Sequence, residues 1–165
     1  MTQHSPLKHV LIANRGEIAI RIARSAAEAG IATTAVYAKD DNASLHVHRA
    51  DNTIELPGVG PAAYLDIANV VAAAKDCGAD AIHPGYGFLS ENPEFSRDCT
   101  AAGLVFIGPS PETIELLGDK IRSKEAAIQA GVPVVPSSPM WVPGDSPPND
   151  VLPHIGLPSL VKAAA

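Results

Sequence analysis

The sequence predicts an α/β fold in which a mostly parallel sheet carries helices on both faces. Two observations predict it. Over the first two-thirds of the 165 residues, short apolar runs rich in branched side chains alternate with segments of helical periodicity. Hydrophobic residues make up 46% of the chain and charged residues only 18%, so the composition supports a buried core and excludes a disordered chain.

Five strands are expected, each a short apolar run closed by turn residues. The first, over 9–13, reads H-V-L-I-A and ends at Asn14-Arg15-Gly16. The second, over 33–37, reads T-T-A-V-Y and precedes an Asp-Asp-Asn turn. The remaining strands are expected over 53–56, 79–82 and 104–107.

Helices are expected between the strands because apolar residues there recur at helical spacing. Ile18, Ile22 and Ala29 lie on one face of the first helix, and Gly30 ends it. The stretch Gly58–Pro61 is expected to be a loop because glycine and proline interrupt regular structure. The expected helices are 17–29, a short one over 44–50, 65–75, 93–102, one that Pro111 opens at a favoured first-turn position, and 119–130.

Charge and hydropathy argue against two classes of partner. The net charge is −6 and no run of Lys or Arg occurs, which argues against nucleic-acid binding. No apolar run approaches the ~18 residues of a membrane span, and the polar opening Met1–Lys8 lacks an apolar leader core, so we expect a cytoplasmic protein. Cys77 and Cys99 show no metal-ligand spacing and are expected to be buried thiols on helices.

Proline content rises sharply after Val132. Eight of the fifteen prolines lie between Pro133 and Pro158, where no long helix is expected. The segment is interpreted as a linker or as part of a second domain. The sequence then reaches an apolar run that contains Lys162 and stops at Ala165, an unusual place for a domain to end.

The turns after the first and fourth strands are the first candidate sites, because open parallel sheets bind ligands beyond the carboxyl ends of their strands. The turn Asn14–Glu17 has one glycine where a dinucleotide fold carries Gly-x-Gly-x-x-Gly, which argues against NAD or FAD binding. Two interpretations stay open for it. The turn is structural, with Glu17 complementing the helix N-terminus, or Arg15 or Glu17 faces a site.

The loop after the fourth strand, His83–Asn92, is the densest in chemistry. Gly85 and Gly87 let its backbone approach a neighbour closely, and Tyr86 between them offers a flat amphipathic ring. His83 either orients the loop or transfers protons. The residues expected to cap the following helix are Ser90 and Asn92.

Two lysines are candidate phosphate ligands. Lys120 begins a helix, where a cation opposes the helix dipole and gains little structurally. Lys162 lies in an apolar, strand-like run from which it could point into a cleft. From spacing alone, the favoured interpretation is an ordinary solvated lysine at Lys120 and an outward-facing edge lysine at Lys162.

Several strings taken together resemble the biotin carboxylase family, including the matching domains of acetyl-, propionyl- and pyruvate carboxylases. Their order and spacing follow the family over roughly residues 8–165, and the 11-residue string at 82–92 is very specific. The strings are A-N-R-G-E-I-A-I-R-I at 13–22, A-V-Y at 35–37, H-R-A-D at 48–51, Y-L-D-I at 64–67, I-H-P-G-Y-G-F-L-S-E-N at 82–92, F-I-G-P-S at 106–110, G-D-K at 118–120, G-V-P-V-V-P at 131–136 and V-K-A-A-A at 161–165.

The resemblance implies a Rossmann-like N-terminal domain over 8–118 and the start of an ATP-grasp domain over 119–165. It implies a ligase that uses ATP and bicarbonate to carboxylate biotin on a carrier protein, with Mg²⁺ or Mn²⁺ held by residues beyond this sequence. A carboxyltransferase subunit and a second copy of the chain are the other implied partners. The residues matched to roles are Lys120 and Lys162 for ATP, His83, Tyr86 and Gly87 for the biotin-side loop, and Arg21, Arg24 and Glu28 for a dimer face.

The sequence also departs from the family. The family's strand around Lys162 continues into a glycine-rich loop, whereas this sequence stops at Ala165. No catalytic residue and no metal ligand is therefore expected in this chain, and we expect it to be inactive alone, since phosphoryl transfer needs positioned charge and metal. The alternative is a non-catalytic dimerisation or binding module. An NAD-dependent enzyme is a third, disfavoured hypothesis.

Overall fold

A computed structural model describes residues 6–138 and 155–160 of the chain. It divides into two compact units, residues 1–114 and 115–165, which are described separately. This boundary falls inside one helix, and the domain boundary expected at 118/119 stays a prediction. No helix in the described part of the chain is long and apolar enough to cross a membrane.

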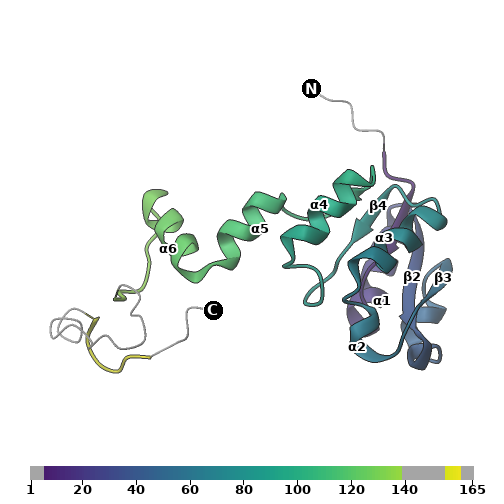
Figure 1. The fold of residues 1–165 in the computed structure, drawn as a ribbon, viewed down its shortest axis with the longest axis horizontal. Helices are drawn as coiled ribbons and strands as arrows, with labels where there is room; N and C mark the ends of the chain where they lie inside the picture. The colour runs from purple at the N-terminus through teal and green to yellow at the C-terminus, as the bar shows by residue number, and fades with distance from the viewer. Residues whose placement is uncertain (1–5, 139–154, 161–165) are drawn as a thin grey trace. The chain divides into compact units, whose positions relative to one another are not determined.

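The first unit is built on a five-stranded sheet with the order β3-β2-β1-β4-β5, in which all neighbours are parallel (Figure 1). This confirms the predicted fold class. The three inner strands, β1, β2 and β4, are short and mostly buried, as parallel strands covered on both faces are. They are β1 (His9–Ile12), β2 (Ala32–Ala38), β3 (Asn52–Leu56), β4 (Ala81–His83) and β5 (Val105–Phe106).

Helices pack on both faces because successive strand residues point in opposite directions. On β1, Ile12 packs with Ala19 and Ala23 of α1 (Gly16–Glu28). Leu11 belongs instead to the larger core on the other face. That core takes residues from α3 (Ile67–Asp76) and α4 (Pro93–Ala101), including Val70, Phe95 and Cys99.

The helix boundaries follow local capping chemistry. Asp66 begins α3 by accepting a hydrogen bond from the Asn69 backbone amide. Asn92 begins α4 in the same way, with the amides of Glu94 and Phe95, so Asn92 rather than Ser90 caps this helix. Gly30 follows α1 with a φ of +71°, the left-handed conformation expected where a helix stops.

The structure corrects the expected loop at Gly58–Pro61. A short helix, α2 (Gly60–Ala63), forms there because proline is favoured in a first helical turn. The expected short helix over 44–50 is a 3₁₀ turn, η2 (Leu45–His48), preceded by another, η1 (Lys39–Asp41). Cys99 is buried as expected, whereas Cys77 lies just past the end of α3 and is half-buried.

The remaining helices are α5 (Pro111–Gly118) and α6 (Lys120–Gln129). Their limits agree with the helices expected from Pro111 and over 119–130. The second half of α5 and all of α6 belong to the second unit. Within that unit, Asp119 caps α6 by accepting from the Ile121 and Arg122 amides.

Candidate functional site

The turns after β1 and β4 lie next to each other at the carboxyl edge of the sheet. The two strands pair in parallel, with Ile12 opposite His83. The Ala13 amide donates to the His83 carbonyl at 2.9 Å, so the two chains leave the sheet side by side. This is where the two turns singled out from the sequence meet.

The loop that follows β4 has an unusual backbone. Gly85 and Gly87 have φ values of +68° and +63°, and Phe88 has a φ of +46°, which is rare for a residue with a side chain. The Gly85 amide donates to Nδ1 of His83 at 3.0 Å. Burial lowers the pKa of His83, so a neutral imidazole is available as this acceptor. In the structure His83 thus orients the loop, while Tyr86 is 68% exposed.

A groove of about 330 Å³ lies between α1 and this loop. Arg21 of α1 lines it together with His83, Gly85 and Tyr86. One residue predicted for a dimer face and two predicted for the biotin-side loop therefore share a surface. The rest of the lining is mainly apolar: Leu7, Val10, Ile18, Ile22, Ser25, Ala26, Ala29, Ile31 and Ile107.

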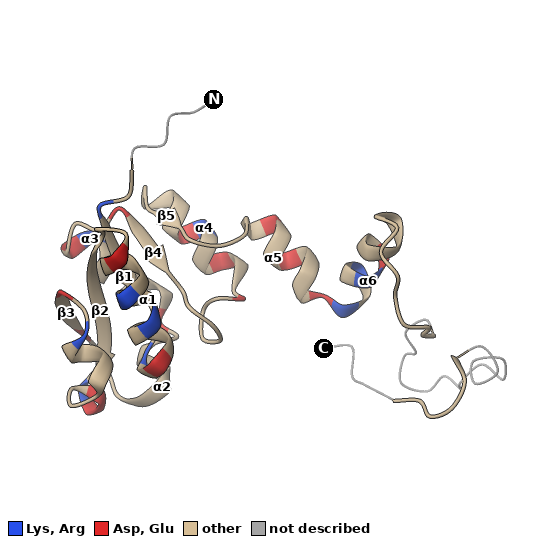
Figure 2. Ribbon diagram, turned by 180° about the vertical axis from the view of Figure 1, so that it is seen from behind, with Lys and Arg blue, Asp and Glu red and all other residues tan. Residues whose placement is uncertain are grey.

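The outer face of α1 carries the other two residues predicted for dimerisation. The side chains of Arg24 and Glu28 are 74% and 73% exposed, and their Nε and Oε1 atoms lie 3.9 Å apart. Figure 2 shows basic as well as acidic positions along this helix. An exposed pair at this separation contributes little to stability, so both groups are accessible to a partner.

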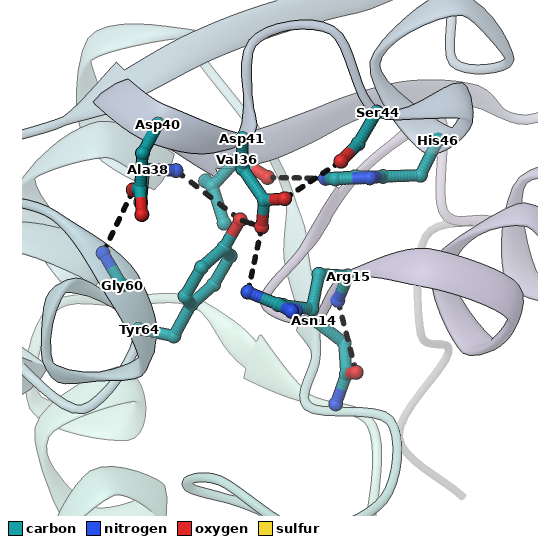
Figure 3. Close-up of polar contacts among 10 residues, drawn as sticks. All are labelled: Asn14, Arg15, Val36, Ala38, Asp40, Asp41, Ser44, His46, Gly60 and Tyr64. Carbon is teal, nitrogen blue, oxygen red and sulfur yellow. Dashed lines mark hydrogen bonds and ion pairs between the residues drawn. The ribbon is translucent and has the colours of Figure 1, made fainter.

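A polar cluster that the sequence did not reveal surrounds Asp41 (Figure 3). One carboxylate oxygen, Oδ2, pairs with Nη1 of Arg15 at 2.8 Å and accepts from the Tyr64 hydroxyl at 2.8 Å. The other, Oδ1, accepts from Ser44 Oγ at 2.6 Å. Burial opposes ionisation of Asp41, but the Ser44 and Tyr64 hydrogen bonds and the Arg15 charge outweigh it and lower the pKa of Asp41.

Tyr64 connects this cluster to the sheet. Its hydroxyl accepts from the Ala38 amide at 3.1 Å, and the Arg15 guanidinium carbon lies 5.7 Å from the centre of its ring. Burial raises the pKa of Tyr64, which stays protonated. Arg15 is thus engaged by the Asp41 carboxylate and the Tyr64 ring, while a site-facing role for its side chain stays a prediction.

His46 is a buried polar residue beside this cluster. It is 1% exposed, and its Nε2 lies 3.3 Å from the Val36 carbonyl. Nδ1 has no hydrogen-bond partner within the described residues. Burial is the main cause that lowers the pKa of His46. The burial of His46 could not be predicted from the sequence, because a histidine in a turn is not distinguished from an exposed one by any spacing pattern.

Of the two candidate phosphate lysines, the structure describes Lys120. Lys120 is the exposed first residue of α6, and Lys162 lies outside the described residues. The Asp119 carboxylate holds the first amides of α6, at 2.8 Å from Ile121 N and 2.9 Å from Arg122 N. Those amides are therefore already satisfied and do not form an anion site.

The described residues do not offer the group of donors that a metal ion needs. Across residues 6–138 and 155–160, no group of three or more His, Cys, Asp or Glu side chains is close enough to hold a metal ion. These residues do not fit Mg²⁺ or Mn²⁺, and no chemical step is assigned to a metal here.

Known proteins are similar to this chain over nearly its whole length. It is 50% identical over 159 residues to a putative urea carboxylase of Emericella nidulans, covering 96% of this chain and 13% of that protein. It is 48% identical over 160 residues to a biotin carboxylase of Halalkalibacterium halodurans, covering 96% of this chain and 35% of that protein.

A solved structure gives the same picture. It is the biotin carboxylase domain dimer of Hydrogenobacter thermophilus 2-oxoglutarate carboxylase, in complex with MgADP, ADP and bicarbonate. It is 49% identical, with a TM-score of 0.77, over 82% of this chain and 30% of that chain.

The chain thus spans 13% to 35% of the length of these two relatives. Its residues 6–114 match the family described as biotin carboxylase, N-terminal domain. This match covers the whole sheet and both turns at its carboxyl edge. The chain therefore belongs to the biotin carboxylase N-terminal domain family.

Proposed function

We propose that this chain supplies the N-terminal part of an ATP-dependent biotin carboxylase. In that reaction ATP and bicarbonate carboxylate biotin on a carrier protein, and a carboxyltransferase part then uses the carboxybiotin. The observation that carries the proposal is the match of residues 6–114 to the N-terminal domain family, together with 48% identity to a biotin carboxylase over 160 residues.

The loop after β4 is proposed to line the biotin side of the active site, with His83, Tyr86 and Gly87 as its contributing residues. Its exposed tyrosine beside a largely apolar groove supports this assignment. An aromatic ring of this kind stacks on a flat bicyclic ligand and still offers a hydroxyl to a polar edge. The neutral imidazole of His83 holds the loop from within.

Lys120 and Lys162 are proposed to contact ATP phosphates in the complete enzyme. A single lysine at the exposed start of α6 cannot neutralise a triphosphate, and phosphoryl transfer depends on positioned charge from several groups. We therefore expect the 165-residue chain by itself to show no biotin-dependent ATP hydrolysis. Activity of the purified chain with MgATP, bicarbonate and biotin would contradict this part of the proposal.

A chimera tests the proposal directly. The segment of the Halalkalibacterium halodurans biotin carboxylase that matches residues 6–114 would be replaced by this chain's residues. The chimera is expected to keep biotin-dependent ATP hydrolysis. A chimera that folds, binds ATP and shows no biotin-dependent turnover would refute the assignment.

Two substitutions in this chimera test the loop. Tyr86→Ala should raise the KM for biotin about 10-fold or more, because an aromatic contact with its buried area is lost. Val59→Ala is the control, since Val59 is comparably exposed at 62% and lies in the segment before α2. Equal KM values for the two variants would count against the biotin-side role.

A second candidate function is a non-catalytic dimerisation or binding module. The exposed Arg21, Arg24 and Glu28 on α1 favour it, as does the dimer formed by the similar carboxylase domain. Light scattering after size-exclusion chromatography should then show a dimer that Arg24→Glu disrupts. Lys75→Glu, a matched charge reversal on α3, should leave it intact, and a monomer at all concentrations would exclude this candidate.

A further inference from the structure

The central crevice of this sheet is occupied by a side chain of the protein itself. β1 connects to β2 on one side, whereas β4 and β5 lie on its other side, so the strand order reverses between β1 and β4. Open parallel sheets hold their ligands at this point, outside the carboxyl ends of the two strands. Here Asn14, the second residue after β1, lies at that point and is 1% exposed.

The amide of Asn14 binds the backbone of the loop after β4. Its Nδ2 donates to the Pro84 carbonyl at 2.8 Å and to the Tyr86 carbonyl at 2.9 Å. Its Oδ1 accepts from the Arg15 amide at 2.9 Å. Two carbonyl acceptors on one side and an amide donor on the other allow only this orientation of the side chain. Both Nδ2 hydrogens are therefore committed to a loop about 70 residues away in sequence.

Gly85 lies between those two carbonyls and packs directly against the same side chain. A Cβ at Gly85 would lie 2.5 Å from Asn14 Nδ2, and the φ of +68° disfavours a side chain as well. Further along the loop, the ring of Phe88 lies 5.3 Å from the ring of Tyr64. This contact holds Phe88, whose positive φ is a rare backbone conformation for a residue with a side chain. The loop is thus held at both ends, and Tyr86 between them has its backbone fixed and its ring exposed.

We propose that Asn14 is a positioning residue for Tyr86: by filling the crevice and holding two loop carbonyls, it fixes where the tyrosine ring stands beside the groove. The role in biotin binding rests on the proposed function, but the geometry of the loop does not. Asn14 is not proposed to touch the substrate. Its effect would pass through the backbone of residues 84–86.

The competing explanation is that Asn14 is an ordinary buried residue whose loss weakens the whole fold. A local readout separates the two. The full 165-residue chain would be labelled with 3-fluorotyrosine, and its three fluorine resonances would be assigned with Tyr37→Phe, Tyr64→Phe and Tyr86→Phe. Hydrogen exchange of the Gly85 amide would report loop opening, because that amide is hydrogen-bonded to His83.

The main variant is Asn14→Asp, which keeps the shape but turns both donors into acceptors that face carbonyl oxygens. Asn14→Ala removes the group altogether. The control is Val70→Ala, which removes buried apolar volume from α3 in the larger core and weakens the fold while every hydrogen bond of Asn14 stays in place. Urea unfolding of all three variants would show how much global stability each one loses.

The proposal predicts that both Asn14 variants shift or broaden the Tyr86 resonance and leave that of Tyr37 in place. Gly85 exchange should accelerate roughly 10- to 100-fold, the range expected for losing two ordinary hydrogen bonds. Val70→Ala should leave the Tyr86 resonance unchanged. An unchanged Tyr86 resonance in the folded Asn14 variants, or an equal change in Val70→Ala, overturns the proposal.

A variant on the loop side covers the case in which the Asn14 variants do not fold. Gly85→Ala places a methyl group against the Asn14 side chain and so disturbs the same contact from the loop. It should therefore move the Tyr86 resonance as well. An unmoved resonance in folded Gly85→Ala overturns the proposal. Failure of the biotin assignment would look different, because the chimera would then be insensitive to Tyr86→Ala while the loop still responded to Asn14.

Discussion

Removing only the hydroxyl of Tyr64 tests how much the polar cluster around Asp41 stabilises the fold. Tyr64→Phe keeps the ring, which is 1% exposed and packs beside Phe88. It deletes one oxygen that accepts from the Ala38 amide at 3.1 Å and donates to Asp41 at 2.8 Å. Both partners remain in place after the substitution.

The expected loss follows from what each partner keeps. The Ala38 amide is fully buried and loses its acceptor, which costs about 1–3 kcal/mol. Asp41 is half-buried and keeps Arg15 and Ser44, so its lost hydrogen bond costs only ~1 kcal/mol. We therefore expect the free energy of unfolding to fall by about 2–4 kcal/mol, a large share of a typical 5–15 kcal/mol.

Urea unfolding at pH 7, followed by far-ultraviolet circular dichroism, measures this loss. The midpoint should fall while the dependence on urea stays the same, because the surface exposed on unfolding is unchanged. Tyr37→Phe is the matched control: Tyr37 is half-buried, and within the described residues its hydroxyl has no hydrogen-bond partner. A loss below ~0.5 kcal/mol in Tyr64→Phe, or the same loss in the control, would refute the reasoning.

Three further predictions concern other buried or capping groups. Burial lowers the pKa of His46 below 6.5, so the unfolded chain binds a proton that the folded chain does not. Unfolding free energy should fall by up to ~1.4 kcal/mol per pH unit below pH 6.5, and His46→Gln should flatten that slope in urea titrations. Burial raises the pKa of the Cys99 thiol to about 12, so iodoacetamide at pH 8 should modify half-buried Cys77 before Cys99. Peptide mass spectrometry would measure the two modification rates, and equal rates would contradict this prediction. Asp66→Ala should cost ~1 kcal/mol by removing the cap of α3, whereas Asp76→Ala at the other end should not destabilise the chain in the same unfolding assay.

The fold was predictable because local signals agreed with the global arrangement. The inner strands are short runs closed by a polar turn or a loop, and α1 and α3 each bury one apolar face. The loop expected at Gly58–Pro61 was wrong for a local reason. Glycine and proline usually interrupt regular structure, but Pro61 lies in a first helical turn, where proline favours a helix.

The contacts of the candidate site were predictable only in part. Sequence reasoning located the two turns and the exposed tyrosine, because parallel topology brings the ends of adjacent strands together. It could not find the Asn14 contacts with Pro84 and Tyr86, since no spacing rule connects residues about 70 positions apart. The contacts of Asp41 with Arg15 and Tyr64 could not be predicted for the same reason. Lys162 lies outside the described residues, so its role stays a prediction.

The contacts of Asn14 explain why the turn after β1 has a single glycine. A dinucleotide fold keeps that turn free of side chains so that a pyrophosphate can approach the backbone. In this chain Asn14 fills the space, and the requirement for glycine moves to Gly85 on the facing loop, where a Cβ would meet the asparagine. A ligand is then excluded from the crevice itself. The biotin-side role proposed for Tyr86 therefore concerns the outer side of the loop, where its ring is exposed beside the groove along α1.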